Sequence, residues 1–322
     1  MTHSLPDFSL LSHSGPPAPV TDTSGLLGEY LAYYRLDRRL PLTETVYSGV
    51  IDAGSWALWT QVWCPPAPRG TVFVVHGYFD HLGLYGHLLE ALLRANWQVV
   101  LWDLPGHGLS NGDRASIDTF NDYVDCLRTV RQTLDEQGLA PGPWCGIGQS
   151  TGSAILATDA LSDPETPWQS LCLLAPLVRP LGWNQSRWLH SALKPFVRTL
   201  KRKFRANSND QHFARFLHHD DPLQPAFLSV SWVSAMRLWM ADLKALPPSP
   251  MPTLILQGKQ DLTVDWQYNL PMLERKFPNA QTVCHDHARH HLVNELPDIR
   301  TPLFDRLVRF IDAPPTAQEA AS

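Results

Sequence analysis

The chain has 322 residues, of which 44% are hydrophobic and 18% are charged, and its formal net charge at pH 7 is −5. These values are typical of one large globular domain, and they exclude a disordered or fibrous protein. The acidic balance also argues against a nucleic-acid-binding protein that relies on overall positive charge.

The cysteines and the N-terminal sequence bear on the cellular compartment. The five cysteines include no CxxC pair, which argues against a disulfide framework or a zinc site. The first residues lack the basic segment and apolar run of a signal peptide. No stretch of about 18 apolar residues is present to span a bilayer. We therefore expect a cytoplasmic protein with reduced thiols.

The main part of the chain alternates between short apolar runs and stretches of helical spacing. Before it, residues 1–24 are rich in Ser, Pro and Thr, and we interpret them as a flexible leader. Buried strands are predicted at residues 71–76, 98–103, 144–148, 170–175, 253–257 and 281–284. The alternation predicts an α/β fold with a mostly parallel central sheet flanked by helices. Residues 43–50 and 58–62 could add an antiparallel edge.

Residues 175–253 break this alternation. They have helical features and no predicted strand, over a length too great for a simple crossover. We interpret this region as an inserted helical cap. The predicted organisation is a leader at 1–24, a first core segment at 25–176, the cap at 177–250, a second core segment at 251–312 and a flexible tail at 313–322.

The sequence Gly148-Gln149-Ser150-Thr151-Gly152 matches G-x-S-x-G between a predicted strand and a predicted helix. This is the context of a nucleophile elbow. Small residues two positions before and after the serine allow a sharp turn that exposes its hydroxyl. The helix N-terminus supplies amides where negative charge develops. We therefore predict that Ser150 is a catalytic nucleophile.

A serine nucleophile needs a base that an acid orients, and in this fold the chain order is Ser, then Asp or Glu, then His. Asp261 follows the predicted strand at 253–257 directly, and we favour it as the acid over its rival Asp265. The loop after the last predicted strand contains His285, His287, His290 and His291. Apart from Asp286, no Cys or carboxylate with ligand spacing accompanies them, so we expect no metal ion. Spacing alone leaves the choice of base open.

The loop at residues 76–81 (HGYFDH) follows the first buried strand. In this architecture that loop supplies one amide of the oxyanion hole, and the residue after the nucleophile supplies the other. The predicted backbone donors are therefore Tyr78 and Thr151. We interpret His76 as a structural histidine that holds the loop rather than as a catalytic group.

These segments resemble the α/β-hydrolase superfamily, and within it the monoacylglycerol lipase and lysophospholipase branch. Residues 76–85 resemble its H-G-x-x-[ED]-H-x-x-x-Y motif, and residues 103–114 resemble its D-x-x-G-H-G-x-S-x-G-x-R motif. Residues 221–223 resemble a D-P-L found in its cap, and residues 258–261 resemble its G-x-x-D acid turn. The resemblance covers most of residues 45–312 and is weakest across the cap.

The family motif A-x-H-x-x-x-x-E resembles Ala288-Arg289-His290 followed by Glu295, and it selects His290 over His291 as the base. The resemblance implies ester hydrolysis through an acyl-enzyme, without a cofactor or metal. Ser150 would attack the ester carbonyl, and His290 would carry the proton. Asp261 would orient the imidazole and stabilise its charged form.

The predicted cap carries a basic segment at residues 183–205, which has no Asp or Glu. Its basic residues are Arg187, Lys194, Arg198, Lys201, Arg202, Lys203 and Arg205. Aromatic and aliphatic residues lie between them at roughly helical spacing. This pattern predicts peripheral contact with an anionic membrane at its inner face, or attraction of a phosphate-bearing substrate. The alternative is a solvated basic face over a packed apolar stripe.

Our first hypothesis is a serine carboxylester hydrolase that acts on monoacylglycerols or lysophospholipids. The alternatives are a carboxylesterase for short-chain soluble esters and a non-hydrolytic relative that uses the pocket to bind a ligand. An aminopeptidase is disfavoured, because a basic cap does not suit the ammonium group of its substrate. A dehalogenase would need Asp in place of Ser150.

Overall fold

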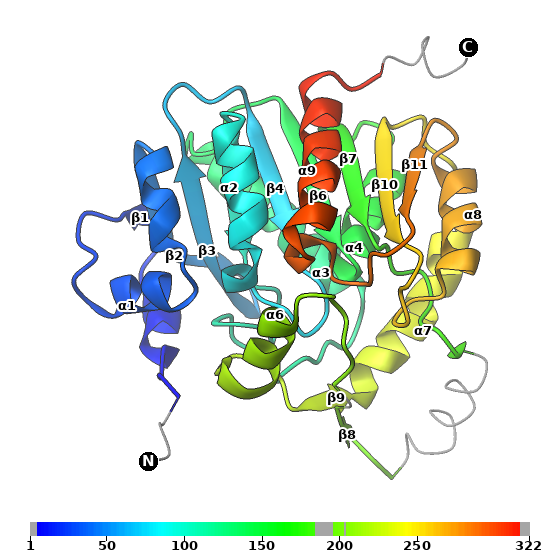
Figure 1. The fold of residues 1–322 in the computed structure, drawn as a ribbon, viewed down its shortest axis with the longest axis horizontal. Helices are drawn as coiled ribbons and strands as arrows, with labels where there is room; N and C mark the ends of the chain where they lie inside the picture. Colours follow the sequence, from blue (N-terminus) through cyan, green and yellow to red (C-terminus); the bar gives the residue numbers. More distant parts are fainter. Residues whose placement is uncertain (1–4, 184–195, 203, 316–322) are drawn as a thin grey trace.

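The computed structural model describes residues 5–183, 196–202 and 204–315. The centre of this described part is a nine-stranded sheet in the order β1-β2-β3-β5-β4-β6-β7-β10-β11 (Figure 1). Its strands are β1 (Ala18–Pro19), β2 (Thr45–Ala53), β3 (Trp56–Cys64), β4 (Thr71–Val75), β5 (Gln98–Trp102), β6 (Trp144–Gln149), β7 (Trp168–Leu174), β10 (Thr253–Gly258) and β11 (Gln281–His285). All neighbours from β5 to β11 are parallel, whereas β1, β2, β3 and β5 pair antiparallel. The predicted mostly parallel sheet is confirmed.

Helices cover both faces of the sheet, because apolar residues along each parallel strand point alternately to two cores. In β4, Phe73 and Val75 belong to one core and Val72 and Val74 to the other. The covering helices are α2 (Gly86–Arg94), α3 (Asn121–Glu136), α4 (Thr151–Ser162), α8 (Trp266–Lys276) and α9 (Pro297–Asp312). Figure 1 shows α2 and α9 in front of the sheet and α3 and α4 behind it. The carboxyl ends of the parallel strands are thereby left for loops.

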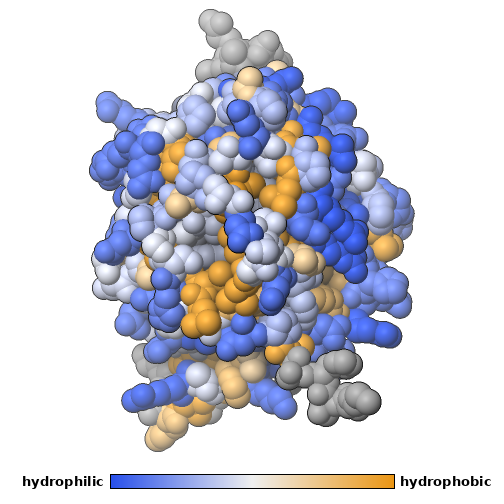
Figure 2. Space-filling view, turned by 90° about the vertical axis from the view of Figure 1, so that its left-hand side faces the viewer, coloured by the Kyte–Doolittle hydropathy of each residue, from blue (hydrophilic) through white to orange (hydrophobic). Residues whose placement is uncertain are grey.

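Residues 5–24, which the sequence analysis interprets as a flexible leader, are mostly exposed but contact the core at a few points. The Phe8 side chain is buried, and its ring lies edge-on to Tyr30 with 5.3 Å between the ring centroids. The amide of Val50 donates to the carbonyl of Gly15, and β1 pairs with β2. One aromatic anchor and these backbone bonds order a segment whose composition predicts disorder. Figure 2 views this side of the molecule, where hydrophobic residues form a patch bordered by hydrophilic ones.

The region predicted as the cap contains two short strands as well as helices. Its described elements are β8 (Thr199–Lys201), α6 (Gln211–Arg215), a short π-helix (Phe216–Asp220), β9 (Phe227–Ser229) and α7 (Val230–Ala245). β8 and β9 pair antiparallel, which corrects the expectation of a cap without strands. Three residues per strand are too few to show a recognisable alternation. Of the basic segment, residues 184–195 (with Arg187 and Lys194) and Lys203 lie outside the described residues.

Within the described ranges, no helix combines enough length with enough apolar character to cross a membrane.

Candidate active site

Ser150 occupies a strained turn between β6 and α4. Its backbone φ is 54° and its ψ is −108°, a region that residues with a Cβ rarely adopt. The flanking glycines permit this turn because no side chain fits there. A Cβ on Gly148 would lie 2.4 Å from the carbonyl carbon of Gly152, and a Cβ on Gly152 would lie 2.0 Å from the oxygen of Val75. The turn holds Ser150, which is 7% exposed, at the carboxyl end of the parallel strands.

The Asp261 carboxylate and the His290 imidazole face each other after β10 and β11. His290 Nδ1 lies 2.7 Å from Asp261 Oδ2. Asp261 Oδ1 accepts the amides of Thr263 at 2.7 Å and Val264 at 3.1 Å, and Gln257 Nε2 donates to its Oδ2 at 3.1 Å. These bonds fix the carboxylate, which in turn holds Nδ1 of the His290 ring.

Burial and charge act in opposite directions on this pair. Burial by itself raises the pKa of Asp261, but the charge and hydrogen bond of His290 outweigh it and the pKa is lowered. Burial likewise lowers the pKa of His290, but Asp261 outweighs it and the pKa is raised. The pair therefore favours an ionised carboxylate that stabilises an imidazolium.

The structure gives the other three histidines and Asp265 different surroundings. Nδ1 of His285 accepts the amides of His287 and Ala288 within its own loop. Nε2 of His291 lies 3.2 Å from Oδ2 of Asp80. Asp265 forms an ion pair with Arg179 at 2.6 Å. Across the described residues, no group of three or more His, Cys, Asp or Glu side chains is arranged to hold a metal ion.

The loop between β4 and α2 lies against the Ser150 turn. A Cβ on Gly77 would be 3.4 Å from Cβ of Ser150. The Tyr85 hydroxyl accepts the Gly77 amide and donates to Oδ2 of Asp80, each at 3.0 Å, which fixes the loop beside Tyr78. Thr151 begins α4, so its amide is among those that a helix N-terminus leaves without an internal partner. Both predicted oxyanion donors thus belong to segments that border Ser150.

His76 and Asp103 connect the loops that follow β4 and β5. Nε2 of His76 accepts the Leu104 amide at 2.9 Å, and burial lowers the His76 pKa to about 3, which keeps the ring neutral. Asp103 accepts the amides of Leu82 and Leu109, each at 2.7 Å. The histidine and the aspartate of the two sequence motifs therefore position backbone.

His81 and Asp221 join the cap to the core. His81 Nε2 lies 3.0 Å from Asp221 Oδ2, and both side chains are fully buried. Asp221 Oδ1 also accepts the hydroxyl of Tyr34 at 2.8 Å, from the residue that follows α1 (Leu26–Tyr33). Burial disfavours the charged form of both residues, but the charge and hydrogen bond of the other residue favour it more strongly. The pKa of His81 is therefore raised and that of Asp221 is lowered. The D-P-L segment of the cap is thus anchored beside the predicted oxyanion loop.

Two glutamines that the sequence analysis missed also position the site. Gln149 Nε2 donates to the carbonyl of His290 at 2.8 Å, so the residue before the nucleophile holds the histidine loop. Gln257 holds Asp261, as described above. Both are buried polar residues at the end of an apolar strand. A polar residue at the end of an apolar strand was the available signal in the sequence. A buried side-chain amide without a hydrogen-bond partner nearby in the chain needs a partner from a distant segment.

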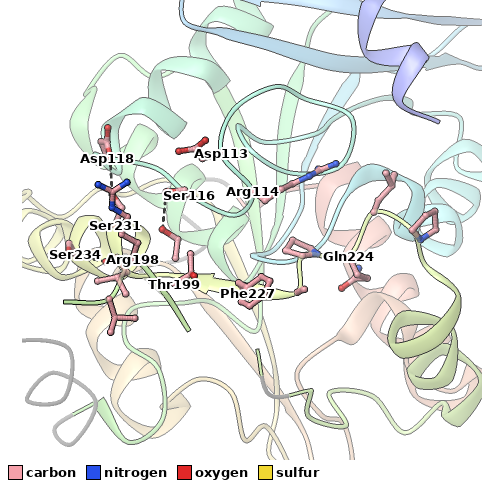
Figure 3. A pocket seen from close by; sticks show the side chains of 17 residues that line it. Asp113, Arg114, Ser116, Asp118, Arg198, Thr199, Gln224, Phe227, Ser231 and Ser234 are labelled. Carbon is pink, nitrogen blue, oxygen red and sulfur yellow. Dashed lines mark hydrogen bonds between the residues drawn. The ribbon is translucent and has the colours of Figure 1, made fainter. Parts of the chain in front are cut away.

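A cavity of about 760 Å³ is lined by residues other than the predicted triad. Figure 3 shows the side chains that line it. Its described lining includes Ser116 and Ser229, whose hydroxyl oxygens are 2.9 Å apart, but not the predicted nucleophile, acid or base. Tyr78 borders it, because its hydroxyl donates to the Ala115 carbonyl at 2.6 Å and accepts the Ser229 amide. The Tyr78 ring also stacks on Trp232 of α7 with 3.8 Å between the centroids.

Comparison with known proteins gives consistent matches. The family model described as "Serine aminopeptidase, S33" matches residues 66–297. Monoglyceride lipase of Mus musculus is 28% identical over 261 residues, which cover 78% of this chain and 85% of the mouse protein. The crystal structure of Paleococcus ferrophilus monoacylglycerol lipase has a TM-score of 0.67 at 21% identity and covers 79% of this chain and 98% of its own. A soluble variant of Saccharomyces cerevisiae monoglyceride lipase, in complex with a substrate analog, has a TM-score of 0.70 at 17% identity. The match covers 83% of this chain and 95% of the yeast chain.

Proposed function

This chain belongs to the α/β-hydrolase family described as serine aminopeptidase S33, in its monoacylglycerol lipase branch, and on that premise we propose a serine carboxylester hydrolase with Ser150, His290 and Asp261 as its triad. The observation that carries the proposal is the 2.7 Å contact of His290 with Asp261 beside the strained Ser150 turn. A hydroxyl on such a turn needs a base held in one tautomer, and this contact provides it.

The reaction proceeds through an acyl-enzyme. His290 Nε2 takes the hydroxyl proton as Ser150 Oγ bonds to the ester carbonyl carbon, and the amides of Tyr78 and Thr151 bind the resulting oxyanion. The bond to the alcohol oxygen then breaks, and His290 returns its proton to that oxygen. Water next attacks the acyl-enzyme and gives a proton to His290. The bond between the acyl carbon and Ser150 Oγ then breaks, His290 gives that proton to Oγ, and the carboxylic acid leaves.

We propose monoacylglycerols or lysophospholipids as the substrates, in keeping with the mouse relative named monoglyceride lipase. The cavity of about 760 Å³ that Tyr78 borders supports an acyl group as part of the substrate. Apolar side chains contribute to its lining, among them Val197, Leu223, Phe227 and Val230. Acyl chains gain binding energy with each methylene that such side chains remove from water.

The activity of the purified protein will depend on acyl length. We expect kcat/KM for p-nitrophenyl esters to rise at least about tenfold from acetate to octanoate, because each buried methylene is worth about 0.8 kcal/mol. Monoacylglycerols and lysophospholipids of one acyl chain, assayed alongside, separate the two head groups. Equal or faster cleavage of the acetate ester would instead identify a carboxylesterase for short-chain soluble esters.

We also propose that the protein is cytoplasmic and that its cap makes peripheral contact with an anionic membrane. The contact would be with the inner face of that membrane. Exposed apolar and basic side chains occur together there: Phe196 is 86% exposed and Phe227 is 53% exposed, and Arg198 and Lys201 are exposed beside them. The five free cysteines suit a reducing compartment. Such a combination favours the interface of an anionic bilayer.

Arg202 does not take part in this surface. Its guanidinium lies 4.1 Å from the Phe79 ring centroid and donates to Gln224 Oε1 at 2.6 Å. Burial lowers its pKa to about 10. A test of membrane contact should therefore leave Arg202 unchanged, because its replacement would disturb the packing of the cap.

Charge reversal will weaken membrane binding. We expect Arg198→Glu/Lys201→Glu to lower the affinity for vesicles containing phosphatidylglycerol by about tenfold or more, since each basic group near an anionic surface contributes about 1 kcal/mol. Co-sedimentation at low and high salt measures it, and the effect should diminish with salt. Arg306→Glu/Arg309→Glu on α9 is the matched control. Equal binding by the cap variant and the wild-type protein would show that these residues form an ordinary solvated surface.

A further inference from the structure

A second cavity, of about 270 Å³, lies where the N-terminal segment meets α2 and the cap helix α6. Figure 1 shows α6 below α2 and beside α1. The lining side chains on which the argument rests are Tyr33, Arg35, Arg38, His87, Phe213 and Phe216. One wall comes from residues 33–39, which precede the part of the chain that the family model matches, at 66–297. None of the predicted triad residues lines this cavity.

The rim of the cavity is basic. Arg35 and Arg38 are exposed, and within the described chain neither guanidinium forms a hydrogen bond or ion pair. Arg35 has a φ of 59°, which ends α1 and starts the 3₁₀ turn Asp37–Leu42 that carries Arg38. The chain as a whole has a net charge of −5. The two guanidinium groups, three positions apart, make this rim locally positive.

The remaining charges of the cavity are engaged with the protein. Arg39 is buried, and it donates to the Gly86 carbonyl at 3.0 Å and pairs with Glu90 at 3.0 Å. Asp210 is the N-cap of α6 and accepts the amides of His212 and Phe213. The carboxylate is thus tied to the helix, whereas the cations on the rim are free to bind a ligand.

Aromatic rings from residues 33–39 and from the cap also line the cavity. Tyr33 and Phe216 are half-buried, with 5.8 Å between their ring centroids, and half-buried Phe213 packs edge-on to His291 at 4.8 Å. Half-buried rings beside free guanidinium groups are suited to a ligand that has one planar face and one anionic end.

We propose that this cavity binds a small organic phosphate that carries a planar ring. The phosphate oxygens accept hydrogen bonds from the guanidinium groups of Arg35 and Arg38, whose planar forks match them bidentately. The ring of the ligand packs against Tyr33 and Phe216. The site does not depend on the proposed triad, because it shares no lining residue with it.

Isothermal titration of the full chain with phenyl phosphate tests the proposal. We expect saturable binding, and a loss of affinity of at least about tenfold in Arg35→Gln/Arg38→Gln, because charge-assisted bonds to phosphate supply most of the interaction. Arg275→Gln/Arg309→Gln removes the same charge from exposed positions on α8 and α9 and should bind like the wild-type protein. Inorganic phosphate and phenol should each bind more weakly than phenyl phosphate.

Two results would overturn the site: the absence of saturable binding to the wild-type protein, or equal affinity in the Arg35/Arg38 variant. Tighter binding of benzoate than of phenyl phosphate would overturn the phosphate assignment. Both arginines are exposed and bind no described side chain, so the variant should fold, and its rate of p-nitrophenyl octanoate hydrolysis should match the wild-type rate. The binding result therefore stands apart from the outcome for the proposed triad.

Discussion

Replacement of Ser150 by alanine will lower kcat for ester hydrolysis by about a millionfold while the protein stays folded. The alanine has no nucleophile, so His290 and Asp261 have no hydroxyl to activate and the acyl-enzyme cannot form. Only binding and the oxyanion amides remain, and they supply a small part of the rate enhancement. Hydrolysis of p-nitrophenyl octanoate measures the rate, and thermal unfolding checks the fold.

A control on the same helix separates this loss from general damage to α4. Ser162 is exposed at the end of α4 and accepts a hydrogen bond from Arg128 Nη2, so Ser162→Ala should retain nearly full activity. A fluorophosphonate probe gives a second measurement, because it should label the wild-type protein and the Ser162 variant but not the Ser150 variant. Retention of more than about a tenth of the wild-type rate by Ser150→Ala would contradict the assignment of the nucleophile.

The features that could be predicted from the sequence have local signals. β4 and β6 are short apolar runs that end at turn residues, and such runs predict buried parallel strands without knowledge of their partners. The G-x-S-x-G pattern specified the turn at Ser150 for a similar reason. The Cβ contacts that exclude other residues at Gly148 and Gly152 arise largely within the turn and with the adjacent strand β4.

The features that the sequence could not predict depend on contacts between distant residues. His81 meets Asp221 across 140 positions, and Gln149 meets His290 across 141. The periodicity of hydrophobic residues does not predict such a pair, because it shows only that each position is polar and gives no partner for it. Phe8 is a similar case, since its burial depends on the rings of α1.

The boundaries of the cap at 177 and 250 remain predictions. Within the described part of the cap, α7 packs on the core, because Trp232, Met236 and Trp239 are buried in one of the two cores. The cap strands β8 and β9 have three residues each, and the D-P-L segment is held to the core loop by the ion pair of Asp221 with His81. Burial in α7 depends on contacts with distant residues, so the sequence of the cap alone does not mark where the cap begins and ends.

Replacement of Asp261 by asparagine will lower kcat by about 10⁴-fold and will also move the pH profile. In the wild-type protein, kcat/KM falls as the pH falls through the pKa of His290, because the base must be neutral. Asp261 raises that pKa above the ordinary value of 6.5. The asparagine removes this charge and leaves burial, which lowers the pKa, so the acidic limb of the profile should move to lower pH.

Asp265→Asn is the matched control, because it changes the rival aspartate only four positions away. Its carboxylate is paired with Arg179 at 2.6 Å and lies outside the His290 contact, so its loss should leave the acidic limb in place and kcat within about tenfold of the wild-type value. A merely structural role for Asp261 would lower the yield of folded protein without moving the limb. An unmoved limb in Asp261→Asn, or a moved one in Asp265→Asn, would therefore reassign the acid of the triad.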